Sequence, residues 1–209
     1  MIHQHLPKKK HKHPQTFLNT FNMKKTKELK RMFCFIIFFS FFSFITNNMA
    51  FPLSTKSHWI IDEKGQRVKL ACVNWPSHLQ PVVAEGLSKQ RVDDLAKKIL
   101  EMGFNCVRLT WPLDLATNET LANNVTVRQS FQRLGLTDDI SGFQTKNPSM
   151  IDLPLIEAYK KVVAKLGDKN VMVILDNHVT KPGWCCGYDD GNGFFGDTFF
   201  DPLNWETKM

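Results

Sequence analysis

The chain has 209 residues, of which 43% are hydrophobic, and a formal net charge of +7 at pH 7. Its length suggests one domain, or one domain with a tail. Residues 1–31 carry +8 and the remaining 178 residues carry −1, so the basic charge lies in a Lys/His-rich tail. This distribution argues against nucleic acid as a partner of the folded part.

An apolar segment follows the tail. Phe33 to Ile45 spans 13 residues, and its polar members are two serines. This length fits the apolar region of a signal peptide and falls short of the roughly 20 residues that cross a bilayer. We therefore expect residues 1–31 to be a disordered tail or an upstream extension, residues 32–50 a signal peptide, and residues 51–209 a secreted mature chain. The alternative is a membrane protein anchored through Phe33 to Ile45.

The predicted mature chain holds four cysteines, which allow three pairings in an oxidising compartment. They are Cys72, Cys106, Cys185 and Cys186. Adjacent cysteines rarely pair with each other, because disulfide geometry does not suit neighbouring residues. The sequons at Asn118 and Asn124 are typical of a secreted glycoprotein and predict that their segment is exposed.

No cofactor or metal ion is expected. The paired histidines near the amino terminus lie in the tail, whose composition makes them incidental. Asp190 and Asn192 resemble the start of a calcium loop, but the glycine and the twelfth-position glutamate of such a loop are missing.

The first elements after residue 51 are predicted to be a strand pair, a strand and a helix. Trp59–Asp62 and Gln66–Val68 form the pair, and Val68–Trp75 (VKLACVNW) follows as a buried strand. Ser88 can cap the helix, which should end at Gly103. Its apolar residues recur at helical spacing, at Val92, Leu95, Ala96 and Ile99.

Two further strands follow, at Phe104–Trp111 and Val171–Asp176. Between them, Pro154 opens a helix that ends at Gly167. This alternation is typical of right-handed parallel units. The connections after strands are long and those after helices are short. The extra residues therefore collect at the carboxyl ends of the strands, where α/β folds place their functional groups.

Two α/β architectures fit this pattern. A nucleotide-binding doubly wound sheet needs a glycine-rich turn after its first strand, but residues 74–78 read NWPSH. A (β/α)8 barrel has no such requirement, although a complete barrel takes roughly 250 residues. Residues 51–209 show three units, so the predicted fold is α/β, a (β/α)8 TIM barrel truncated after about three βα units.

Polar residues at the strand ends form the candidate site. Arg108 lies in an otherwise apolar strand, so it either holds a carboxylate in a site or reaches solvent at an edge. His178 ends the third strand beside Asp176 and Asn177, and is either a site residue or a structural histidine. Asp176 could orient the imidazole or contact the backbone of the turn.

The loop after the third strand is rich in aromatic residues. GWCCGYDDGNGFFGDTFFDPLNW places Trp184 and six further aromatic rings among glycines and acids. Such rings stack on the apolar faces of sugars, while polar groups bond the hydroxyls, so the loop predicts a polysaccharide or oligosaccharide partner. For the phenylalanines, capping of the barrel is the alternative.

Three strand motifs occur in the order VKLACVNW, GFNCVRLTW and VILDNH. Together with WCC and DGNGFFGD, they resemble the family 5 glycoside hydrolases, the cellulase-like family, and its plant secreted members in particular. The resemblance covers residues 51–209. It implies a barrel that hydrolyses β-linked polysaccharides with retention, in the manner of endoglucanases or mannanases, in the cell wall or apoplast.

The resemblance also implies roles for individual residues. Arg108 corresponds to the arginine that bonds the nucleophile carboxylate, and His178 to the histidine that contacts the sugar at the cleavage point. Asn74 and Trp75 fall at the end of the first strand, near the substrate.

The two catalytic glutamates of the family follow the fourth and seventh strands, and we expect them beyond Met209. Glu206 is the last acid, but it lies at the start of a predicted helix and receives no catalytic role. We therefore expect this chain to be inactive by itself. The alternative function is a non-catalytic remnant that binds glycan or a partner through its aromatic loop.

Overall fold

The computed structural model describes residues 53–185, 187–193, 196–200, 202–203 and 206. The chain divides into two units, Met1–Ala50 and Phe51–Met209, and every described residue lies in the second unit. The predicted tail and signal peptide therefore lie outside the described residues. Among the residues that are described, no helix is long and apolar enough to cross a membrane.

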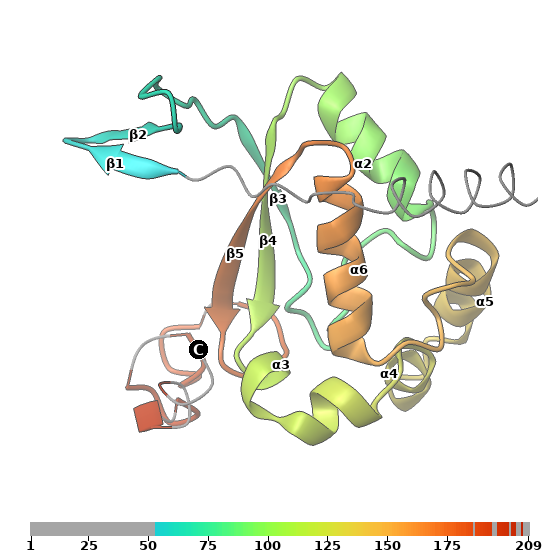
Figure 1. The fold of residues 1–209 in the computed structure, drawn as a ribbon. Helices are drawn as coiled ribbons and strands as arrows, with labels where there is room; N and C mark the ends of the chain where they lie inside the picture. The colour runs from blue at the N-terminus through green and yellow to red at the C-terminus, as the bar shows by residue number, and fades with distance from the viewer. Residues whose placement is uncertain (1–52, 186, 194–195, 201, 204–205, 207–209) are drawn as a thin grey trace, which may run out of the picture. The chain divides into compact units, whose positions relative to one another are not determined.

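Three parallel strands form the centre of the second unit (Figure 1). They lie in the order β3 (Cys72–Trp75), β4 (Cys106–Pro112) and β5 (Met172–Val179). Helix α2 (Val92–Glu101) connects β3 to β4, and α6 (Leu155–Gly167) connects β4 to β5. Both helices cover the same face of the sheet (Figure 1). The predicted alternation of strands and helices is confirmed, while the described strands form an open sheet and not a closed barrel.

The core lies between the sheet and these two helices. Val107 and Leu109 of β4 are fully buried, as are Val162 and Leu166 of α6. Alternate residues of β4 point toward the helices, and the α6 residues recur at helical spacing. Each such side chain stabilises the fold by about 1.5–3 kcal/mol. Tyr159 of α6 donates its hydroxyl to the Leu109 carbonyl at 3.2 Å, and burial raises its pKa.

The amino-terminal hairpin differs from the predicted one. Strand β2 (Trp59–Ile61) pairs along its length with β1 (Ser54–Lys56), an upstream strand that the sequence pattern did not indicate. The predicted partner, Gln66–Val68, forms no continuous strand and contributes a single bridge to Ile61. Ser57 adopts a left-handed conformation (φ 56°), which permits the tight turn between β1 and β2.

The outer strands of the sheet are more exposed than predicted. Of Val68–Trp75, only the last four residues form a strand, and Cys72 within it is exposed. In β5, Ile174 and Leu175 are 41% and 59% exposed. Both strands lie at edges of the described sheet, so each has a neighbouring strand on one side only. Aliphatic content therefore predicted where these strands occur, but not where β3 begins or how far the two strands are buried.

Helix α2 is capped by a residue that is distant in sequence. The predicted cap Ser88 is not used, and the helix begins at Val92. Asn147 Oδ1 accepts the Val92 N–H at 3.0 Å, and the Asn147 amide donates to the Leu87 carbonyl at 2.7 Å. Gly103 (φ 87°) follows the last turn and ends the helix as predicted, since glycine adopts left-handed φ without strain.

The long connection between β4 and α6 folds into short helices. They are α3 (Asp114–Thr117), the π-helix η1 (Thr120–Asn124), α4 (Val127–Arg133) and α5 (Thr137–Lys146). Phe131 of α4 packs against Phe143 of α5, with ring centroids 5.8 Å apart. Asn118 and Asn124 of the two sequons are both exposed, as the sequence predicted.

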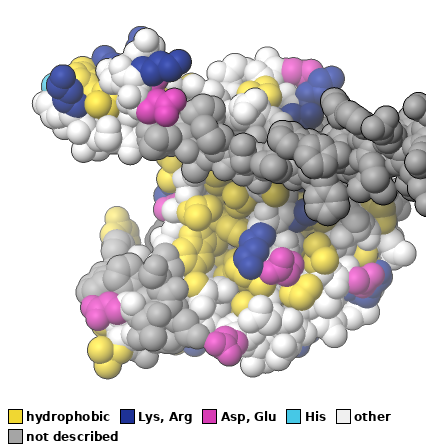
Figure 2. Space-filling view, viewed as in Figure 1, with side chains coloured by type: hydrophobic (Ala, Val, Ile, Leu, Met, Phe, Trp, Pro, Cys, Tyr) yellow, Lys and Arg dark blue, Asp and Glu magenta, His cyan; other side chains and the backbone are white. Residues whose placement is uncertain are grey.

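A groove along α6 and β5 is lined almost entirely by apolar side chains. Its volume is about 450 Å³, and its lining includes Trp111, Val163 and Leu175. Figure 2 shows hydrophobic side chains gathered on this side of the molecule. The indole N–H of Trp111 is buried and has no hydrogen-bond partner. In a (β/α)8 barrel, such a surface packs against the next strand-helix unit.

Candidate functional site

The register of the sheet decides which strand residues share a face. Arg108 pairs with Asn74 on one side and with Ile174 on the other, and Thr110 pairs with Asp176. Paired side chains point to the same side of a sheet, and so do side chains two residues apart on one strand. The face opposite to α2 and α6 therefore gathers Asn74, Arg108, Thr110, Asp176 and His178.

An ion pair between neighbouring strands lies at the centre of this cluster. Arg108 Nη2 is 2.8 Å from Asp176 Oδ2, and Arg108 Nη1 donates to Asn74 Oδ1 at 3.3 Å. The side chains of Arg108 and Asp176 are 39% and 21% exposed. Since β4 is the central strand, the alternative of an edge arginine that reaches solvent does not describe Arg108.

Asp176 also orients the imidazole of His178. His178 Nδ1 lies 2.8 Å from the same Oδ2 atom that Arg108 contacts. An ionised carboxylate can only accept hydrogen bonds, so Nδ1 carries the proton and Nε2 is the acceptor of the ring. Arg108 Nη2 lies 3.3 Å from His178 Nδ1, a contact between two protonated nitrogens and not a second hydrogen bond. Of the two roles expected for Asp176, this geometry favours orientation of His178.

Three other candidate residues lie apart from this network. Trp75 alternates to the helix-covered face, where it is buried and donates its indole N–H to the Glu85 carbonyl at 2.9 Å. Asn177 alternates to the face opposite to His178 and is exposed. Trp184, on the loop after β5, is 78% exposed. The structure therefore brings neither Trp75 nor Asn177 to the polar face, and it presents Trp184 to solvent.

The structure adds Thr110, His78 and Ser77 to the residues that the sequence reasoning singled out. His78 is buried three residues after β3, with Nδ1 2.7 Å from Thr110 Oγ1. Its ring centroid lies 4.4 Å from that of His178. Burial and the neighbouring His178 lower the pKa of His78 from its ordinary value. The available signal was its position directly after a strand end, in the stretch NWPSH.

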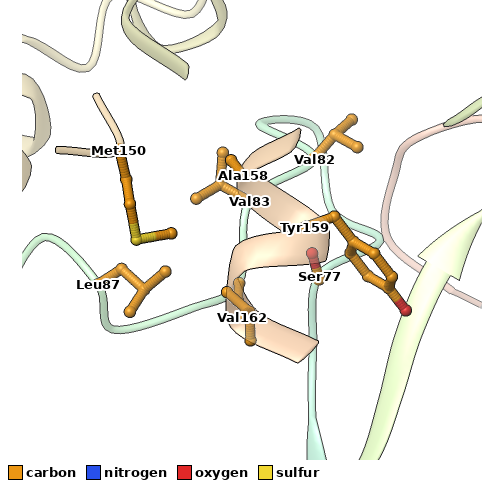
Figure 3. A pocket seen from close by; sticks show the side chains of 9 residues that line it. Ser77, Val82, Val83, Leu87, Met150, Ala158, Tyr159 and Val162 are labelled. Carbon is orange, nitrogen blue, oxygen red and sulfur yellow. The ribbon is translucent and has the colours of Figure 1, made fainter. Parts of the chain in front are cut away.

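Ser77 lies between the polar cluster and an apolar cavity behind it. Figure 3 shows Ser77 beside Tyr159 and Val162 of α6, with Val82 also in the cavity wall. The cavity is too small for a water molecule, and Ser77 Oγ is buried without a hydrogen-bond partner. The Ser77 backbone N–H donates to Thr110 Oγ1 at 3.0 Å. This hydrogen bond connects the backbone before His78 to β4, whereas the hydroxyl of Ser77 has no partner among the described residues.

Polar side chains in the loop after β5 organise its backbone. Asp190 accepts hydrogen bonds from the N–H groups of Gly187 and Asn192, both at 3.0 Å. Asn192 Oδ1 accepts the N–H of Lys181 at 2.7 Å. Across the described ranges, no group of three or more His, Cys, Asp or Glu side chains could hold a metal ion.

A disulfide joins the amino ends of β3 and β4. Cys72 and Cys106 are register partners, their Cα atoms are 4.3 Å apart, and 34 positions separate them in sequence. Sequence reasoning left three pairings open, and the structure contains this one; Cys185 is also disulfide-bonded. Closing a loop of this length stabilises a fold by roughly 3–4 kcal/mol in the chain-entropy description. The bond lies at the end of the strands opposite to the polar cluster, so its contribution is structural.

The fold is similar to that of solved endocellulases. A hyperthermostable endocellulase matches with a TM-score of 0.50 and 22% identity, over 64% of this chain and 33% of that chain. A hyperthermophilic endocellulase from the archaeon Pyrococcus horikoshii matches with a TM-score of 0.50 and 21% identity, over the same shares. The described strand-helix units therefore correspond to a part of the fold of these endocellulases.

Comparison of sequences identifies the family. The chain is 53% identical over 157 residues to a glycosyl hydrolase 5 family protein from Chamaecyparis obtusa, a match that covers 75% of this chain and 28% of that protein. It is 24% identical over 130 residues to an endoglucanase from Paenibacillus polymyxa, over 62% of this chain and 28% of that protein. The chain belongs to glycoside hydrolase family 5. It spans about 28% of the length of these two relatives, and no family model matches it.

Proposed function

We propose that this chain forms the substrate-positioning part of a retaining hydrolase that cleaves O-glycosyl bonds in β-linked polysaccharides, in the manner of an endoglucanase or a mannanase. The observation that carries the proposal is the network of Arg108, Asp176 and His178, in which both contacts to Asp176 are 2.8 Å. Asp176 and His178 lie toward the carboxyl end of β5, and the side chain of Arg108 reaches Asp176 from the first half of β4. The carboxyl end of the strands is where (β/α)8 barrels hold their active sites. The family relationship supports a glycan as the substrate.

The cluster has the hydrogen-bonding groups that a sugar and a carboxylate require. His178 keeps Nδ1–H on Asp176, so Nε2 can accept a hydrogen bond from a sugar hydroxyl. Arg108 has five N–H donors and directs two of its nitrogens to Asp176 and Asn74. Its remaining donors suit a further carboxylate that enters the polar face, which is the role that the family resemblance implies for Arg108.

We place the catalytic carboxylates outside this polar face. Retention needs two carboxyl groups about 5 Å apart across the bond that is cleaved. On the polar face of the described sheet, the carboxylate is Asp176, which is already held by Arg108 and His178. A carboxylate with both partners in place is poorly suited to act as nucleophile or proton donor. We assign both catalytic roles to residues outside the described sheet, and we expect the chain by itself to be inactive.

A chimera tests this function. Residues 53–209 replace the matched segment of the Chamaecyparis obtusa protein, and the release of reducing sugar is measured on cellulose, mannan and other β-linked glycans. We expect the chimera to hydrolyse the glycans that the parent hydrolyses, and the full chain alone to release no sugar. Arg108→Ala in the chimera should lower kcat/KM by about 10²-fold or more. A folded chimera that keeps its activity after Arg108→Ala contradicts the proposal.

A second candidate function is glycan binding without hydrolysis. Trp184 and Tyr188 on the loop after β5 are 78% and 96% exposed. Exposed aromatic rings of this kind suit stacking on sugars. In this case the full chain binds cello-oligosaccharides, Trp184→Ala abolishes the binding, and Arg108→Ala leaves it unchanged. Under the hydrolase proposal, Arg108→Ala changes the activity of the chimera, so the two variants separate the candidates.

We also propose that the protein is secreted and is glycosylated at Asn118 and Asn124, both of which are exposed. The proposal is supported by the apolar segment Phe33 to Ile45 and by the two sequons. Amino-terminal sequencing of the product from a eukaryotic host should give a mature end near Phe51, and peptide mapping should give two glycosylated asparagines. A cell-associated product that retains Phe33 to Ile45 supports the membrane anchor instead.

A further inference from the structure

We propose that His78 is a positioning residue of this site, anchored by Thr110 and packed against His178 so that the His178 imidazole keeps its orientation toward Asp176. The inference depends on the proposed function in one respect, namely that the ligand in contact with His178 is a glycan. The orientation itself is a property of the chain and can be measured without any glycan.

His78 lies where four segments of the chain meet. Its side chain is bound to Thr110 of β4 at 2.7 Å, and its ring lies against His178 of β5, with 4.4 Å between centroids and 51° between planes. Its backbone carbonyl accepts the N–H of Gly183 at 3.1 Å, in the loop after β5. His78 itself belongs to the connection after β3. One buried residue therefore ties the ends of all three strands together.

The contacts of Thr110 favour one of the two neutral tautomers of His78. Thr110 Oγ1 accepts the Ser77 N–H at 3.0 Å and lies 2.7 Å from His78 Nδ1. Among the described contacts of Thr110 Oγ1, His78 Nδ1 is the group that can accept the hydroxyl proton, so we infer that Nδ1 is unprotonated and Nε2 carries the hydrogen. Thr110 thus selects one tautomer of a neutral imidazole.

The groups around His78 favour the same neutral state. Its ring packs against the His178 imidazole, and the Arg108 guanidinium and the Asp176 carboxylate act on it electrostatically. Burial, His178 and Arg108 lower the pKa of His78, and Asp176 raises it, with burial the largest cause. A charged His78 would compete with His178 for Asp176. A neutral His78 packs against His178 and leaves the hydrogen bond between His178 and Asp176 in place.

The experiment measures the protonation of imidazole nitrogens by 15N NMR of the full chain at neutral pH. In the wild-type chain, we expect His78 to be unprotonated at Nδ1 and protonated at Nε2, and His178 to be protonated at Nδ1. Thr110→Val removes the hydroxyl at similar volume. It should populate the second tautomer of His78 and shift the Nδ1 resonance of His178, and Thr110→Ser should restore both. The exposed His58 is the internal reference, and Thr117→Val is the matched control, because Thr117 donates to the Leu113 carbonyl elsewhere.

Two results would overturn the inference. One is a proton on His78 Nδ1 in the wild-type chain. This measurement does not depend on the folding of any variant. The other is a Thr110→Val chain whose His178 resonances match the wild type although those of His78 change.

Glycan binding adds a separate readout. Thr110→Val should weaken cello-oligosaccharide binding about three- to tenfold, the range expected for one hydrogen bond. If the wild-type chain binds no glycan, that result counts against the proposed function. The nitrogen resonances still decide the role of His78.

Discussion

The side chain of Asn147 accepts the backbone N–H of Val92 at 3.0 Å, and so joins the helical insertion after β4 to the first turn of α2. Asn147 is buried, and its amide also donates to the carbonyl oxygens of Leu87 and Gln90. The Asn147 side chain therefore forms hydrogen bonds with three backbone groups, which belong to Val92, Leu87 and Gln90.

Asn147→Ala should destabilise the fold. The substitution leaves buried backbone groups of Val92 and Leu87 without partners, which costs about 1–3 kcal/mol. Urea denaturation of the two chains gives the difference in the free energy of unfolding. Asn123→Ala is the control, because Asn123 is exposed, and it should change stability by about 0.5 kcal/mol or less. Equal effects of both substitutions would contradict the capping role of Asn147.

Gly142→Ala should destabilise the chain, whereas Gly167→Ala should not. A Cβ at Gly142 would meet the backbone carbonyl of Ser88, which cannot move without disturbing the connection before α2. The expected loss is about 1–3 kcal/mol. A Cβ at Gly167, the last residue of α6, meets nothing within 4 Å, so alanine there should be neutral or stabilise by up to about 1 kcal/mol. Thermal unfolding of both variants checks the contrast.

Ser77→Ala should leave stability unchanged or raise it. Ser77 Oγ is buried without a partner in a cavity too small for water, so its removal takes away an unsatisfied polar group. Ser130→Ala is the matched comparison, since Ser130 Oγ donates to the Pro81 carbonyl at 2.7 Å. That variant should lose about 1 kcal/mol. A larger loss for Ser77→Ala than for Ser130→Ala would mean that the Ser77 hydroxyl has a partner in solution.

The free energy of unfolding should fall as the pH drops through the range in which His78 titrates. Burial and His178 lower the pKa of His78 in the folded chain below the ordinary value of about 6.5 that it has when unfolded. Between these two values the unfolded state binds more protons, so stability rises with pH and is lost as the pH falls below about 6.5. Urea denaturation from pH 5 to 7.5 measures this slope. His78→Phe should reduce the slope and Ser77→Ala should keep it; a slope unchanged by His78→Phe would assign it to other groups.

The ion pair between Arg108 and Asp176 should show a modest coupling energy. Because Arg108 is 39% exposed, solvent screens the pair, and we expect about 1 kcal/mol from a double-mutant cycle of Arg108→Met and Asp176→Asn. Denaturation at low and high salt measures the cycle, and the coupling should weaken at high salt. A coupling near zero at low salt would show that the pair has no energetic role, whatever its geometry.

The strand and helix order could be predicted because its signals are local. The helical spacing after Pro154 predicted α6, and Gly103 marked the end of α2. The burial of Ile174 and Leu175 could not be predicted, because their exposure depends on the neighbours of β5 and not on its composition. The partner of β2 was also missed, since residues 54–56 carry no strong strand signal of their own.

The candidate site, too, could be predicted from the sequence only in part. Its strand-end residues could be found from the sequence, but Trp75 and Asn177 adjoin Asn74 and His178 in the chain and lie on the opposite face. Successive strand residues alternate between faces, so a position near a strand end does not say which face receives the side chain.

The sequence by itself determined the alternation of strands and helices, and it placed Arg108 within the second of the parallel strands and His178 at the end of the third. These signals are local, because periodicity and helix termini act over a few residues. The tertiary structure decided which side chains meet. His78 reaches Thr110 across 32 positions, and Asn147 reaches Val92 across 55. Such contacts depend on sheet register and on the packing of distant segments, which local patterns do not encode.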